Sequence, residues 1–166
     1  MVSGRAILRG ALALALVLGA PAGVQAESWG GITPGTSTID DLRGRYGPPS
    51  KELREKLEGY DTTQWVYEGV KAPSGVTRLT VHFGLLGPGG YRPEVVRDFV
   101  VVPHRRVFSR VAVLDGWGRP DRVGTDEGRT FFFYSVGLVV YFDDAGEDAR
   151  SMYFTLPQSA PPPATK

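Results

Sequence analysis

Cysteine is absent from the chain of 166 residues, and histidine and methionine occur only twice each. Without cysteine the protein cannot form a disulfide, a thiolate zinc site, a cysteine nucleophile or a lipid-modified N-terminal cysteine. An excess of charge is also lacking, since 19 lysines and arginines stand against 18 aspartates and glutamates. A nucleic-acid-binding domain is expected to be more basic than this, so we expect no nucleic-acid partner.

Glycine and proline, in contrast, are frequent, with 22 and 13 residues respectively. Hydrophobic residues make up 42% of the chain and charged residues 22%. This composition indicates a globular protein with many turns rather than a disordered one.

The N-terminal segment has the pattern of a signal peptide. Arg5 and Arg9 precede an apolar run over residues 11–20, and Val24-Gln25-Ala26 has small residues at both ends. This pattern predicts export and cleavage after Ala26. The run is shorter than the ~20 residues that a membrane-spanning helix needs, and an uncleaved anchor is the alternative. We therefore predict a periplasmic or secreted protein that is not a lipoprotein and does not insert stably into the membrane after cleavage.

A short motif occurs twice in the remaining chain, as Tyr46-Gly47-Pro48-Pro49 and as Trp117-Gly118-Arg119-Pro120. Each copy follows a segment with the apolar spacing of a helix and precedes segments typical of strands. This repetition predicts a duplicated unit.

The two predicted helices are defined by different signals. In the first, Ile39, Leu42 and Tyr46 share one helical face, with Ser37 as the N-cap and Gly47 as the stop. In the second, the shared apolar face is expected to hold Val107, Val111 and Leu114. Residues 51–58 carry six charges and place Leu53 and Leu57 four residues apart, which predicts an additional surface helix.

Six further segments are rich in β-branched and aromatic residues and predict strands. They are residues 61–68, 76–83, 94–102, 129–136, 138–143 and 150–156. The expected fold is α+β, with two tandem ααβββ units whose helices pack on antiparallel sheets. The predicted boundaries are a signal peptide at 1–26, unit one at 27–103, unit two at 104–156 and a disordered Pro-rich tail at 157–166.

The ordered series of these motifs resembles the BamE/SmpA/OmlA family. The resemblance rests on Ile32-Thr33-Pro34-Gly35-Thr36-Ser37, Leu42, Tyr46-Gly47-Pro48-Pro49, Trp65-Val66-Tyr67 and Leu79-Thr80-Val81-His82-Phe83. It implies two helices against a three-stranded antiparallel sheet, duplicated in tandem as in the β-lactamase inhibitor protein. The residues expected to carry this structural motif are Gly35, Ser37, Gly47, Pro49, Trp65, Gly118 and Pro120.

Two departures from these families concern function. BamE proteins are lipid-anchored through a cysteine and the inhibitor proteins contain disulfides, and this chain has no cysteine. The resemblance therefore supports the fold more strongly than any one activity.

The strands of unit two are apolar on both faces. If Gly137 centres a two-residue turn, Phe131 and Phe133 lie on the helix side. The residues then left on the other face are candidates for binding a partner: Phe132, Tyr134, Tyr141 and Tyr153. Tyrosine is common at protein interfaces, and in the inhibitor proteins the concave sheet face docks on the enzyme. The alternative is that this face packs against unit one.

Candidate catalytic residues are few. His82 falls on a polar strand face and His104 lies between the units, and neither has a second ligand at metal-binding spacing. The acidic residues 143–148 fit a hairpin turn better than a calcium loop. We therefore predict that the protein is not an enzyme and has no metal or cofactor.

The function predicted from the sequence is that of an exported protein-binding module. One hypothesis is an accessory factor in outer-membrane or envelope protein assembly, as the BamE resemblance implies. The alternative is a secreted or periplasmic enzyme inhibitor like the β-lactamase inhibitor protein. A hydrolase or ligand-binding protein with an unrecognised site is the third hypothesis, and the partner and oligomeric state stay open.

Overall fold

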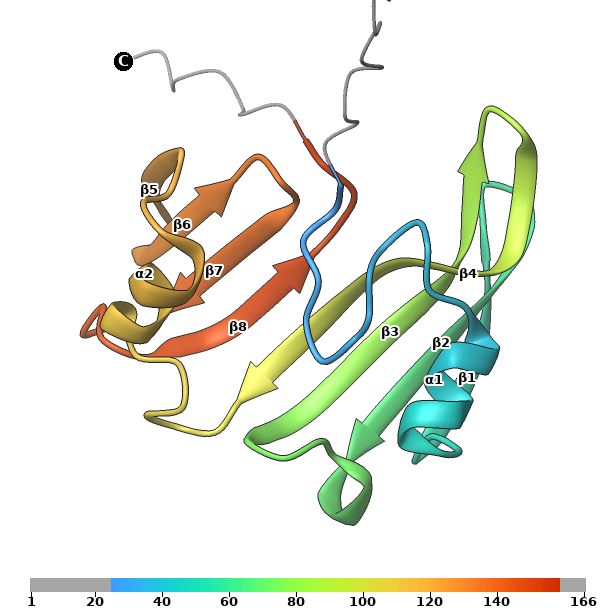
Figure 1. Ribbon diagram of the computed structural model, residues 1–166, viewed down its shortest axis with the longest axis horizontal. Helices are drawn as coiled ribbons and strands as arrows, with labels where there is room; N and C mark the ends of the chain where they lie inside the picture. Colours follow the sequence, from blue (N-terminus) through green and yellow to red (C-terminus); the bar gives the residue numbers. More distant parts are fainter. Residues whose placement is uncertain (1–24, 159–166) are drawn as a thin grey trace, which may run out of the picture.

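The computed structural model describes residues 25–158, so most of the predicted signal peptide and Pro-rich tail lies outside the described residues. The described chain contains one eight-stranded antiparallel sheet and two α-helices (Figure 1). The strands lie side by side in the order β1-β2-β3-β4-β8-β7-β6-β5. In the described part of the chain, neither eight-residue helix has the length to cross a bilayer.

Each half of the sheet follows one helix along the chain. The first half consists of α1 (Ile39–Tyr46), β1 (Lys51–Leu57), β2 (Tyr60–Glu68), the 3-10 turn η1 (Gly69–Lys71), β3 (Val76–Gly87) and β4 (Gly90–Pro103). The second consists of α2 (Arg110–Trp117), β5 (Arg122–Asp126), β6 (Arg129–Tyr134), β7 (Leu138–Phe142) and β8 (Ala149–Phe154). The halves join where β4 pairs with β8, and Phe99 lies opposite Phe154 there.

The prediction of two tandem ααβββ units is wrong, because the chain forms a single sheet with one helix for every four strands. Within residues 51–58, expected as a helix, Lys51–Leu57 forms the edge strand β1, and strand β5 was not predicted. The Leu53 and Leu57 spacing fits one face of a strand as well as one face of a helix. Lys51 reaches Glu68 at 2.6 Å and Lys56 reaches Asp61 at 2.8 Å. Such charged side chains protect an exposed edge from pairing with another chain.

The helix starts also differ from the sequence prediction. The N-cap of α1 is Thr38, whose side chain forms a capping box with Asp41. Ser37 is buried one residue earlier, and its hydroxyl accepts a hydrogen bond from the Thr33 N–H at 2.9 Å. Gly47 ends α1, as predicted.

The second helix begins later than its apolar pattern indicates. Ser109 is the N-cap of α2, so Val107 precedes the helix. Val113 is the buried residue of α2, whereas Val111 and Leu114 are exposed. Gly118 ends this helix, as predicted.

Both helices cover the same face of the sheet. Figure 1 shows α1, α2 and the segment that precedes α1 in front of the strands. Ile32, Leu42 and Val113 from these segments are fully buried or nearly so and belong to the core that the strands line. We call this side of the sheet the covered face and the opposite side the open face.

Candidate functional site

An aromatic cluster lies on the open face of the second half of the sheet. The register places Phe131 of β6 opposite Tyr141 of β7, and Val139 of β7 opposite both Phe133 and Tyr153 of β8. Because residues directly opposite each other point to the same face, these five side chains share one surface. We call them the aromatic patch.

The rings of the patch contact one another across the strands. The ring centroids of Phe131 and Tyr141 are 5.7 Å apart, and those of Tyr141 and Tyr153 are also 5.7 Å apart with an edge-to-face arrangement. Tyr153 is 40% exposed and Phe133 only 5%. Phe131, Val139 and Tyr141 are half-buried. The patch therefore presents apolar area to solvent on a rigid, hydrogen-bonded support.

A hollow of about 470 Å³ adjoins the patch. Its walls come from Tyr141 and Tyr153 together with Val139, Ser151, Asp126, Glu127 and Arg129. The Tyr141 hydroxyl donates to the Asp126 carboxylate at 3.4 Å. Partial burial raises the pKa of Tyr141, and the negative charge of Asp126 raises it further. The hydroxyl of Tyr141 therefore keeps its proton and donates this hydrogen bond to Asp126.

Two of the four predicted binding residues lie on the other face. Phe132 and Tyr134 are only 2% and 4% exposed, because they belong to the core on the covered face. Phe132 packs edge to face against Phe142, with centroids 4.7 Å apart. Tyr141 and Tyr153 lie on the open face. Phe131 and Phe133, expected on the helix side, belong to the aromatic patch on the open face instead.

The reason for this error is the length of one turn. Tyr134 lies opposite Leu138, and the Gly137 N–H donates to the Tyr134 carbonyl at 3.0 Å. Three residues rather than two therefore connect β6 and β7. A one-residue shift in register moves every side chain of a strand to the opposite face.

The residues expected to carry the BamE-like structural motif lie in turns, in the core and in connections between elements. Gly35 has a φ of 80°, and its N–H donates to the Val96 carbonyl at 2.8 Å. Trp65 is 2% exposed in the core, as predicted. The Pro49 carbonyl accepts a hydrogen bond from Lys71 Nζ at 2.9 Å. Pro120 lies in the connection between α2 and β5.

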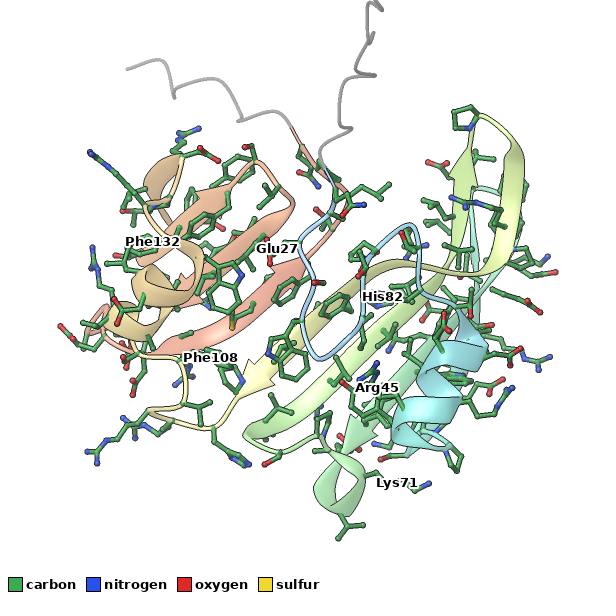
Figure 2. All side chains as sticks on the ribbon, viewed as in Figure 1. Glu27, Arg45, Lys71, His82, Phe108 and Phe132 are labelled. Atoms are coloured by element: carbon green, nitrogen blue, oxygen red, sulfur yellow. The ribbon has the colours of Figure 1, made fainter. Side chains whose placement is uncertain are left out.

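A second polar group lies on the open face, where the sequence predicted His82 but not its partner. His82 of β3 is paired with Asp98 of β4 through Nδ1 and Oδ1. Arg97 Nε donates to the other carboxylate oxygen of Asp98 at 2.8 Å. Burial raises the pKa of Asp98, but the hydrogen bonds and positive charges of His82 and Arg97 outweigh it and hold the pKa below its usual range. Figure 2 labels His82 in the first half of the sheet.

This His82–Asp98 pair does not form a hydrolytic triad with its strand neighbours. A triad requires a hydroxyl or thiol nucleophile within hydrogen-bond reach of the histidine. Gln64 lies opposite His82 on β2, and Asp98 is opposite it on β4. Among residues 25–158 there is no group of three or more histidines and carboxylates that could hold a metal ion.

The acidic segment at residues 143–148 forms a turn. The Asp143 carboxylate accepts hydrogen bonds from the N–H groups of Glu147 at 2.9 Å and of Asp148 at 3.3 Å. These bonds hold the pKa of Asp143 below its usual range. The carboxylate thus satisfies the backbone of the β7–β8 connection.

Comparison with solved structures finds similarity to a DUF4309 family protein, YjgB, from Bacillus subtilis. The two chains share 10% sequence identity with a TM-score of 0.48, over 80% of this chain and 88% of that chain. No family model and no curated protein matches the chain.

Proposed function

We propose that the chain is an exported, non-enzymatic protein-binding module that docks through the open face of its sheet. The observation that carries this proposal is the aromatic patch, which lies on the face opposite both helices. The partner is a protein of the cell envelope or of the medium outside the cell.

The chemistry of the patch favours a protein partner. Tyr141 and Tyr153 each combine a large apolar ring with a polar tip, and such side chains are enriched in the centres of protein interfaces. Their strands fix the backbone, so binding costs little ordering of the chain. The mechanism is surface complementarity, and the open face supplies it without a covalent step.

Two roles are compatible with such a module. The first is that of an accessory factor in envelope or outer-membrane protein assembly. The second is inhibition of an enzyme, which is favoured by the position of the aromatic residues on the sheet rather than on the helices. In the inhibitor proteins that the sequence resembles, the sheet face is the surface that docks on the enzyme. The identity of the captured partner distinguishes the two roles.

The proposal is tested by affinity capture with matched variants. The protein, expressed from its complete coding sequence, is immobilised and exposed to the envelope fraction and medium of its own cells. Capture is repeated with the double variant Tyr141→Ala/Tyr153→Ala and with Val111→Ala/Leu114→Ala, which removes exposed apolar side chains from α2.

A partner that wild type and the α2 variant retain, and the tyrosine variant loses, supports docking through the open face. A partner that is lost only with the α2 variant would contradict it. Outer-membrane proteins among the specific partners favour the assembly role. A captured secreted or periplasmic enzyme whose activity falls on binding favours the inhibitor role.

A further inference from the structure

We propose that the hollow beside Tyr141 and Tyr153 is a pocket for a basic side chain, lysine or arginine, of the protein partner. This inference rests on the proposed function, because it assigns the partner's chemistry at the same surface. The hollow measures about 470 Å³ and opens on the open face. It can therefore hold one long side chain that projects from a docked protein.

The walls of the hollow suit a cation. Tyr141 and Tyr153 both line the hollow, and their rings meet edge to face with an interplanar angle of 76°. A cation near the face of an aromatic ring is attracted by the ring's quadrupole. Val139 adds an apolar surface for the methylene stem of the side chain, and Ser151 adds a hydroxyl.

The rim of the hollow has a net negative charge. Asp126 and Glu127 contribute two carboxylates, and Arg129 contributes one positive charge. Arg129 is paired with Glu127 at 3.5 Å, and both side chains are more than half exposed. Such an exposed pair contributes little to stability and can rearrange when another cation arrives. The Asp126 carboxylate faces the hollow through its hydrogen bond from Tyr141.

The same charges disfavour an acidic side chain in the hollow. An acidic side chain in the hollow would approach two carboxylates and only one guanidinium. An apolar side chain would fill the space but leave the carboxylates without a new partner. The arrangement therefore discriminates by charge as well as by shape.

The test is an NMR titration of the isotope-labelled protein with three blocked tripeptides. Acetyl-Gly-Lys-Gly-amide carries the proposed cation, and the norleucine and glutamate versions are the uncharged and acidic controls. We expect saturable shifts of the amide signals of Tyr141 and Tyr153 with the lysine peptide. The norleucine peptide should bind about fivefold more weakly, because it lacks the cation–π and carboxylate contacts.

Matched variants distinguish the effect of the carboxylates at the hollow on peptide affinity from the effect of the protein's net charge. Asp126→Asn/Glu127→Gln should weaken the lysine peptide about fivefold or more. Asp115→Asn/Asp144→Asn removes two exposed acidic charges elsewhere and should leave its affinity unchanged. Equal affinity for the lysine and norleucine peptides, or no saturable shift in the hollow, would overturn the pocket assignment.

The experiments can contradict the pocket assignment and the proposed function independently. If a protein partner is lost with Tyr141→Ala/Tyr153→Ala but the lysine peptide does not bind the hollow, the pocket assignment is wrong and protein docking stands. If the lysine peptide binds and no captured protein depends on the two tyrosines, the pocket is supported and protein docking is contradicted.

Discussion

The hydroxyl of Tyr134 donates a hydrogen bond to the carbonyl of Gly118 at 3.1 Å. Gly118 ends α2 with a φ of 75°, so the bond attaches the end of the helix to strand β6. The first half has the same arrangement, in which the Tyr67 hydroxyl donates to the Gly47 carbonyl at 3.0 Å at the end of α1. Each helix is therefore held to the covered face by one tyrosine of the sheet.

This arrangement predicts different effects at two tyrosines on opposite faces of the β6–β7 hairpin. Tyr134→Phe should lower the free energy of unfolding by about 1 kcal/mol, because one partly buried hydrogen bond is lost. Tyr134→Ala should cost about 3–5 kcal/mol, the usual range for truncating a buried aromatic side chain. Tyr141→Ala should cost much less, since this ring is half-buried on the open face. Urea unfolding measures all three, and a costlier Tyr141→Ala than Tyr134→Ala would contradict the assigned faces.

Residues 76–83, predicted as a strand, lie within β3, and their apolar residues alternate with polar ones. Leu79, Val81 and Phe83 alternate with polar residues, and all three are fully buried on the covered face. Strand β1 has no alternation of buried and exposed residues, because all seven of its residues are exposed. An exposed edge strand and an exposed charged helix cannot be distinguished by burial pattern alone.

The candidate site was predicted only in part, for two physical reasons. Phe131, Phe132 and Phe133 are consecutive, so composition cannot say which face each ring occupies, and the length of the turn before Leu138 decides it. The His82–Asp98 pair depends on a register shift between β3 and β4 at this position. Such a bulge adds one residue to one strand, and no residue pattern in this sequence predicts its position.

A glycine in β5 provides a test of the aromatic patch. Gly124 lies opposite Phe131, and a Cβ on Gly124 would come within 2.5 Å of the Phe131 ring. Gly124→Ala should therefore displace this ring and cost about 1 kcal/mol of stability through overpacking. In Gly116→Ala, the new methyl group in α2 meets no atom within 4 Å and should stabilise the helix by ~0.5–1 kcal/mol. Urea unfolding of the two variants should thus give changes of opposite sign, and equal signs would be inconsistent with the packing.

The shared sheet predicts that both halves unfold together. Phe99 and Phe154 stack across the β4–β8 junction with centroids 4.5 Å apart and an interplanar angle of 7°, and both are fully buried. Variants that retain only Trp65 or only Trp117 report on different halves by fluorescence. In each variant the fluorescence midpoint in urea should coincide with the midpoint from circular dichroism. Phe99→Ala should lower both midpoints, and separate transitions for the two halves would refute a single cooperative unit.

The lowered pKa of Asp98 predicts a pH dependence of stability. A carboxyl group whose pKa is lower in the folded state stabilises the fold above its unfolded pKa, about 3.9. This stabilisation is lost as the pH falls through the folded pKa. Asp98→Asn should cost about 1–3 kcal/mol at pH 6, because Arg97 and His82 lose their charged partner.

The variant and the wild type should become more similar in stability as the pH falls toward 3. Other carboxylates with lowered pKa values, such as Asp41 and Asp143, are present in both proteins and cancel in the comparison. Denaturant unfolding at a series of pH values gives the difference directly. A difference that stays constant from pH 6 to pH 3 would show that the charge of Asp98 does not act through this pair.

Docking of a protein on the open face of the sheet is expected to depend on Tyr141 and Tyr153. Its most direct test is the dissociation constant of the purified partner for wild type, for Tyr141→Ala/Tyr153→Ala and for Val111→Ala/Leu114→Ala, measured by calorimetry. Two interface hot spots predict a loss of affinity of about 30-fold or more in the tyrosine variant. The α2 variant should bind like wild type. Unchanged affinity in a folded tyrosine variant would contradict the claim.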